Sequence, residues 1–230
     1  MTQGNFDTNH PFWVLPSYAK KRIQNAWIGQ CLADTYISRL IRMGTQGVHS
    51  HSQMFARDCH GEVDILELRE FKGGRRHTFE YHLQHPGRID VFSPDTEKWP
   101  DFDAEGAVEA MRQLTNYEYG WKGIGEMLAR RVPFVWRLFS TSTDDRLPAD
   151  GKPIRQPFCS HAVSLATHLG GGVDPVPRCP HSQVTPTHLT YSLFYRYEFT
   201  LVSEYCGQQY GYDIFEKAAI NEEYLSQHTR

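Results

Sequence analysis

The chain has 230 residues with 40% hydrophobic and 13% aromatic content, enough for one sizeable core and at most an appended subdomain. A formal net charge of −3 disfavours a large nucleic-acid footprint, and no apolar run approaches the roughly 20 residues of a membrane span. Five cysteines at irregular spacing make no disulfide pattern, and the N-terminus lacks a signal-peptide core. We therefore expect a cytoplasmic protein with an N-terminal arm over residues 1–16 and a single domain over residues 17–230.

Short helices and strands are expected to alternate through the first half of the chain. Ser17 is a suitable cap for the first helix, which is apolar on one side. The expected helices cover residues 18–28 and 36–43, and the expected strands cover residues 29–33, 52–56, 63–70, 77–83 and 88–92. Residues 72–76 (KGGRR) are expected to form a basic, solvated turn between two of these strands.

The second half begins with a clear helix over residues 103–116, with Asp103 as its cap and Glu105 in its first turn. Residues 140–156 form an unusually long loop, and such loops often act as lids or binding segments. Further expected elements are an aromatic segment with a short helix over residues 117–131, a long strand over 191–205 and a terminal helix over 215–227. Without repeats or a shift in composition, these elements predict one α+β domain.

The clearest chemical signal lies in residues 156–172 (QPFCSHAVSLATHLGGG), where apolar residues recur at helical spacing and three glycines end the segment. This pattern places Cys159 in the first turn of a buried helix, where free backbone N–H groups favour an anion. A thiol in such a position is activated when a histidine lies beside it. The alternative is that Cys159 is a small buried hydrophobe, as most cysteines of ordinary domains are.

Two histidines and one carboxylate are candidates to activate that thiol. His49 and His51 occur in GVHSHSQMF at the mouth of an expected strand, where residues two apart point to the same side. Glu67 lies within the apolar strand DILELRE, so it is expected to be at an edge, paired or functional. In a Cys–His–carboxylate set the histidine holds the thiolate and the acid fixes the imidazole tautomer. The alternative is that Glu67 faces solvent and both histidines are loop residues.

Several short motifs share the order found in a known family. They are GQCLADTYISRLIRM, SHSQMF, ILEL, YGWKGI, FCSHAV and TPTHL, spread from about Ile28 to Val202. In this order the chain resembles the circularly permuted papain-like cysteine peptidases of the YiiX type, relatives of the NlpC cell-wall amidases. Lecithin:retinol acyltransferases are more distant cousins. The resemblance implies a small antiparallel sheet or open barrel packed against the helix that carries the cysteine.

The resemblance also implies a role for each matched residue: Cys159 is the nucleophile, His51 is the base, and Glu67 orients His51. Residues implied to line the oxyanion region or the substrate are Tyr119, Ser160 and His161. The motif TPTHL, with Thr185, matches a structural turn after the cysteine helix.

The implied activity is that of a cysteine peptidase or amidase acting on a peptide or acyl-amide substrate, with no cofactor, metal or nucleic acid. Acyltransferase or thioesterase chemistry would use the same parts. A cell-wall peptide is the family-level substrate, which for a chain without a signal sequence would require export by a non-classical route.

Cysteine–histidine pairs suggest a different class of function. Cys159-x-His161 and Cys179-x-His181, with Cys59 beside His60, offer soft ligands of the kind that tetrahedral zinc prefers. A Cys-x-His pair at the start of a helix is poorly placed for two ligands to bind one metal ion. A zinc-stabilised binding module is therefore the alternative prediction and not the main one. A third class, a fold that binds a peptide or acyl group without turnover, is favoured by nothing in the sequence.

Overall fold

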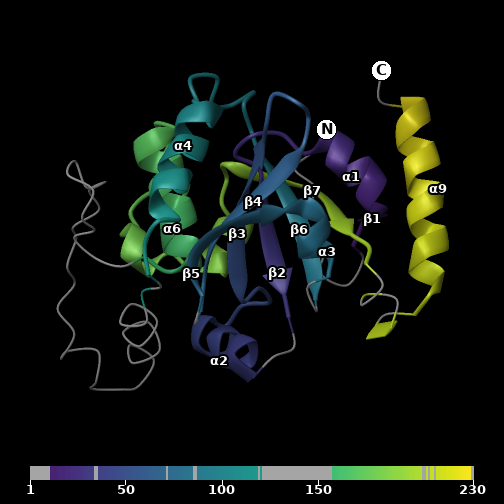
Figure 1. Cartoon of the computed structure of the whole chain (residues 1–230), viewed down its shortest axis with the longest axis horizontal. Helices are drawn as coiled ribbons and strands as arrows, with labels where there is room; N and C mark the ends of the chain where they lie inside the picture. The colour runs from purple at the N-terminus through teal and green to yellow at the C-terminus, as the bar shows by residue number, and fades with distance from the viewer. Residues whose placement is uncertain are drawn as a thin grey trace.

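The computed structural model describes residues 11–33, 36–70, 72–84, 87–118, 120, 157–203, 206, 208–209 and 211–228. These residues form a mixed α+β fold around a seven-stranded sheet with the order β1-β7-β6-β2-β3-β4-β5 (Figure 1). The β1–β7 pair is parallel and the other pairs are antiparallel. The expected α+β class is therefore confirmed.

The strands are β1 (Trp13–Val14), β2 (Ile28–Leu32), β3 (His51–Arg57), β4 (Val63–Arg69), β5 (Gly73–Thr78), β6 (Arg88–Pro94) and β7 (Tyr195–Leu201). The helices are α1 (Pro16–Arg22), α2 (Tyr36–Thr45), α3 (Phe79–Leu83), α4 (Ala104–Leu114), α6 (Cys159–Leu165), α7 (Pro186–Thr190) and α9 (Asp213–His228). A π-helical turn (Ala166–Gly170) continues α6, and a short 3-10 helix covers His181–Gln183.

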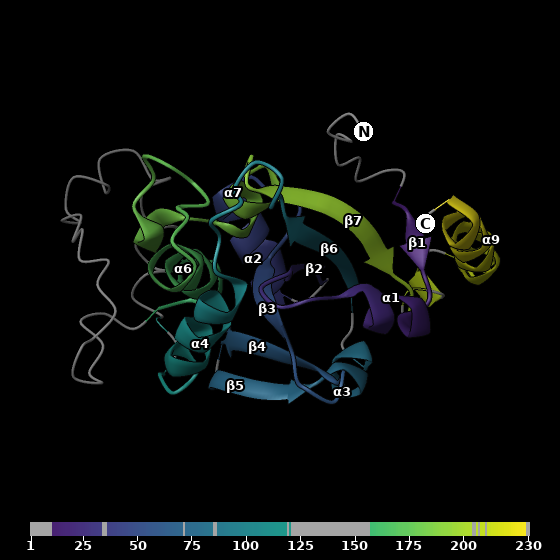
Figure 2. The ribbon, with the colours of Figure 1, turned by 90° about the horizontal axis from the view of Figure 1, so that it is seen from above.

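Helices cover both faces of the curved sheet (Figure 2). On one face, Met54 of β3 and Leu66 of β4 belong to the same buried cluster as side chains of α4 and α6. On the other face, Phe55 and Ile65 pack with α1 and α3. Neighbouring residues of each strand thus point to opposite cores, which explains why β3 and β4 are buried almost throughout. α9 lies outside the sheet edge, against β1.

Part of the segment expected to be an arm belongs to the sheet. Trp13 and Val14 pair with Thr200 and Leu201 of β7, so they belong to the sheet. The first helix is shorter than expected, because the backbone of residues 26–27 already bonds to Phe55 of β3 and draws the chain into the sheet. Its cap is the Leu15 backbone, with no capping side-chain bond, rather than Ser17.

The expected turn over residues 72–76 is wrong, as is the strand over residues 77–83. Residues from Gly73 to Thr78 form β5, and α3 follows at once. The glycines allow a close backbone approach instead of a turn, because a Cβ on Gly74 would lie 2.2 Å from the Thr115 carbonyl oxygen. Gly74 N–H donates to the Tyr117 carbonyl at 2.8 Å, which fixes β5 beside the end of α4.

Other expected elements agree with the structure within a few residues. The expected helices over residues 36–43 and 103–116 correspond to α2 and α4, and Asp103 caps α4 by accepting from the Gly106 N–H. The expected strand over residues 191–205 is shorter, since α7 ends at Thr190 and β7 starts at Tyr195. The expected helix over 117–131 lies almost entirely, and the loop over 140–156 entirely, outside the described residues.

The TPTHL motif forms a capped helix. Thr185 accepts a hydrogen bond from the His188 N–H at 3.2 Å, and the Thr185 N–H donates to His188 Nδ1 at 3.3 Å. This reciprocal capping box fixes the start of α7. Thr185→Ala is expected to lower the free energy of unfolding by about 1 kcal/mol, measured by urea denaturation. Ser17→Ala is the control, and an equal loss there would contradict the assignment.

Candidate functional site

Cys159 is the first residue of α6, and Phe158 is the residue that caps this helix. α6 packs on β3 and β4. The helix is buried at every position, and Cys159 itself is only 2% exposed. The expected position of Cys159 in the first turn of a buried helix is therefore confirmed.

His51 and Glu67 form a buried hydrogen-bonded pair. His51 Nε2 lies 2.6 Å from Glu67 Oε2, with His51 at the first position of β3 and Glu67 inside β4. The side chain of Glu67 is 0% exposed and that of His51 is 9% exposed. The alternative, a solvent-facing Glu67 beside loop histidines, is wrong. Burial of the pair is tolerable because the carboxylate accepts hydrogen bonds from cationic or polarised donors.

The electrostatics of this pair favour a charged imidazole. Burial alone would lower the pKa of His51, but the Glu67 carboxylate and a hydrogen-bonding and electrostatic interaction with Cys159 raise it to about 10. Burial would raise the pKa of Glu67, yet His51, His77 and Arg75 hold it well below its usual value. Both shifts have one cause, the close approach of opposite charges in a site with little water.

Cys159 of α6 interacts with the His51 side chain through hydrogen bonding and charge. Nε2 is taken by the carboxylate, so Nδ1 is the ring nitrogen that remains for the sulfur. Within the described residues Nδ1 makes no hydrogen bond of ordinary geometry, although Cys159 is near enough to stabilise the imidazolium. Loosely aligned contacts of this kind are common in sites without substrate. The structure thus brings three of the expected site residues, Cys159, His51 and Glu67, together.

Two residues that the sequence analysis missed also contact Glu67. Arg75 Nε donates to Glu67 Oε1 at 2.5 Å, and His77 Nε2 lies 3.0 Å from the same oxygen. Both come from β5, the segment that the sequence analysis assigned in part to a solvated turn. The available signal was the spacing of Arg75 and His77, two apart on one strand and therefore on one face.

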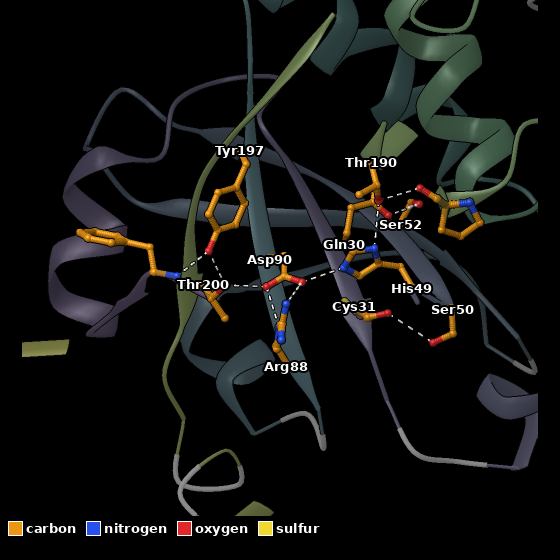
Figure 3. Close-up of polar contacts among 12 residues, drawn as sticks. Gln30, Cys31, His49, Ser50, Ser52, Arg88, Asp90, Thr190, Tyr197 and Thr200 are labelled. Atoms are coloured by element: carbon orange, nitrogen blue, oxygen red, sulfur yellow. Dashed lines mark hydrogen bonds and ion pairs between the residues drawn. The ribbon is translucent and has the colours of Figure 1, made fainter. Parts of the chain in front are cut away.

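His49 belongs to a second, separate network (Figure 3). Its Nε2 lies 2.7 Å from Asp90 Oδ2, and its Nδ1 lies 2.9 Å from Thr190 Oγ1. Arg88 contacts both oxygens of Asp90, at 2.8 and 3.0 Å, and Thr200 donates to Oδ1 at 2.6 Å. Because His49 and Asp90 are both 0% exposed, this network ties β6, β7 and α7 to the chain before β3 and offers no access to a substrate.

The other expected lining residues have different surroundings. Ser160 is buried and its hydroxyl donates to the Val184 carbonyl at 2.7 Å, which links α6 to the segment before α7. His161 is buried with its ring centroid 5.6 Å from that of Phe158. Tyr119 lies outside the described residues.

The cysteine–histidine pairs do not converge on a metal-binding arrangement within the part of the chain that the structure describes. No group of three or more His, Cys, Asp or Glu side chains there is arranged to hold a metal ion. His181 instead bonds to Ser164 Oγ at 2.7 Å and to His168 Nδ1 at 2.8 Å. Cys59 is exposed and Cys159 is buried, so the expected ligands are dispersed over the fold.

Comparison with known proteins finds a distant structural likeness. No family model and no curated protein sequence matches the chain. The fold is similar to the crystal structure of the metalloprotein YiiX from Escherichia coli O157:H7, with a TM-score of 0.38 and 15% sequence identity. The match covers 83% of this chain and 92% of that one. None of the helices within the described residues is long and apolar enough to cross a membrane.

Proposed function

We propose that this chain is a thiol hydrolase that cleaves an amide bond, in a peptide or an acyl-amide, through Cys159, His51 and Glu67. The observation that carries the proposal is the His51–Glu67 pair, 2.6 Å apart and buried, together with the interaction between His51 and Cys159. A charged imidazole held between a carboxylate and a sulfur is the arrangement that thiol catalysis requires. The proposal also takes the domain to be of the permuted papain-like kind.

The reaction would proceed in two covalent steps. The Cys159 thiolate attacks the carbonyl carbon of the substrate, forming the carbon–sulfur bond, while the carbonyl oxygen takes the negative charge. His51 gives its Nδ1 proton to the leaving amine as the carbon–nitrogen bond breaks, which leaves a thioester on Cys159. His51, now neutral, removes a proton from water, and the resulting hydroxide equivalent releases the acid and restores the thiolate.

Glu67 would keep His51 in the tautomer that both steps require. Its carboxylate fixes the proton on Nε2, so that Nδ1 is the nitrogen that exchanges protons with the substrate and water. It also stabilises the imidazolium that exists before attack and after deacylation. Backbone N–H groups at the start of α6, with Tyr119, are the proposed donors to the developing oxyanion.

The test is the rate at which iodoacetamide alkylates each cysteine between pH 5 and 8, with the modified residue identified by mass spectrometry. An ordinary thiol reacts as thiolate, so its alkylation slows about tenfold for each pH unit below its pKa. We expect Cys159 to keep reacting near pH 6, and His51→Ala to slow it about tenfold or more. Cys59, which is exposed, is the internal reference.

His60→Ala is the matched control, because His60 is an exposed histidine on the turn between β3 and β4. It should leave the alkylation of Cys159 unchanged. Alkylation of Cys159 that follows the pH dependence of the unfolded protein, or that ignores His51→Ala, would contradict the proposed thiolate pair.

A further inference from the structure

We propose that Arg75 and His77 are positioning residues that hold Glu67 in the orientation and charge state required by His51. The proposal rests on the proposed function, because it concerns the same Cys159–His51–Glu67 site. It extends that site from three residues to five and adds a third strand, β5, to those that build it.

The two oxygens of Glu67 have separate tasks. Oε2 bonds to His51 alone among the described residues, whereas Oε1 accepts from Arg75 Nε at 2.5 Å and from His77 at 3.0 Å. Arg75 Nη2 also contacts Oε1, so the guanidinium approaches this oxygen with two of its nitrogens. With Oε1 fixed from one side, rotation of the carboxylate would break these contacts, and Oε2 stays directed at His51.

Sheet register explains why these residues meet. Glu67 is the direct antiparallel partner of Arg75, and Ile65 is the partner of His77. Arg75 and His77 are two apart on β5, so both side chains lie on the face that Glu67 occupies on β4. The neighbouring Arg76 points to the opposite face, where it pairs with Asp64.

Burial indicates that these contacts matter. The side chain of Glu67 is 0% exposed, while those of Arg75 and His77 are 19% and 10% exposed. An ionised carboxylate without a counter-charge would be costly at such a position. His51 alone does not secure the charge, because it must lose and regain a proton during the proposed reaction, whereas Arg75 stays cationic throughout.

Tyr81 supports the two positioning residues from outside. The guanidinium carbon of Arg75 lies 5.9 Å from the centroid of the Tyr81 ring. The His77 ring meets Tyr81 edge to face, with centroids 5.2 Å apart. Because Tyr81 belongs to α3, which directly follows β5, one local segment supplies both positioning residues and the ring behind them.

The charged and titratable groups that act on Glu67 come from several elements. They are His51 of β3, Arg75 and His77 of β5, and Cys31 of β2, while Cys159 of α6 acts on His51. Of these, the guanidinium is the group whose charge does not change in the working pH range. Loss of the Arg75 guanidinium is therefore expected to raise the pKa of Glu67. At low pH, Glu67 would then be protonated more readily and would stabilise the charged His51 less.

The experiment is the pH profile of Cys159 alkylation in Arg75→Met, Arg75→Lys and Arg76→Met. Arg75→Met is expected to shift the acid limb of the profile to higher pH by about one unit, as for a carboxylate that loses an adjacent cation. Arg75→Lys, which keeps the charge, should restore most of the wild-type profile. Arg76→Met is the matched control, since its side chain is 58% exposed and pairs at the surface, and should shift nothing.

Circular dichroism would establish that each variant is folded at the assay temperature, and His77→Phe is a second variant in case Arg75→Met does not fold. His77→Phe removes one donor to Oε1 and should shift the acid limb in the same direction by a smaller amount. If His51→Ala slows alkylation but Arg75→Met and Arg76→Met give the same profile, the positioning role is wrong and the proposed function stands. If His51→Ala has no effect, the proposed function itself fails.

Discussion

Replacing Glu67 by glutamine is expected to lower the pKa of His51 from about 10 towards 6.5, its ordinary value. Burial then acts without an opposing carboxylate, and burial disfavours the charged imidazole. A smaller fraction of His51 would then be protonated at pH 7, and alkylation of Cys159 at pH 6 should slow about tenfold or more. NMR titration of the imidazole, assigned by comparison with His51→Gln, measures the pKa directly.

The same pair predicts how stability depends on pH. Because the pKa of Glu67 is lowered, its stabilising contribution is present above the ordinary value of 4.5 and is lost as the pH falls. Because the pKa of His51 is raised, its contribution is complete below 6.5 and is lost as the pH rises toward 10. The difference in unfolding free energy between the wild type and Glu67→Gln should therefore be largest between about pH 4.5 and 6.5.

Asp64→Asn is the matched control for both measurements. Asp64 lies on the same strand as Glu67, but its carboxylate pairs with the exposed Arg76. It should leave the pKa of His51 and the alkylation of Cys159 unchanged. A His51 that remains protonated at pH 8 in Glu67→Gln would show that the carboxylate is not the source of the raised pKa.

The sequence was sufficient to find Glu67, because a carboxylate between Ile65, Leu66 and Leu68 is anomalous in a buried strand. It was also sufficient to find the helix that begins at Cys159. It could not decide between His49 and His51, because residues two apart on a strand point the same way. In the structure His49 lies before β3, outside the strand, and bonds to Asp90.

Asp90 is a second carboxylate inside an apolar strand. In the strand RIDVF it is flanked by apolar residues as Glu67 is, but its partner Arg88 is on its own strand and its other partners are far away in sequence. Arg75 and His77 were missed for a different reason. A pair of glycines was interpreted as a turn, whereas Gly74 permits contact with the backbone of α4. Long-range contact of this kind leaves no local pattern.

Asp90→Asn is the second substitution with a large expected effect, and it acts on stability. Asp90 is 0% exposed and neutralises Arg88, whose side chain is 4% exposed. Burial would raise the pKa of Asp90, but His49 and Arg88 lower it, so the carboxylate is ionised and the network carries charge. Removing one partner of a buried ion pair leaves an uncompensated charge, which costs about 3–5 kcal/mol.

Urea denaturation at pH 7 would measure this loss. Asp213→Asn is the matched control, because Asp213 pairs with Lys217 on the exposed face of α9 and should have little effect. The double variant Asp90→Asn with Arg88→Met should recover part of the loss, since it removes the cation that the single variant leaves buried. Equal stabilities for Asp90→Asn and Asp213→Asn would mean that water reaches Arg88 and that the network is not sealed.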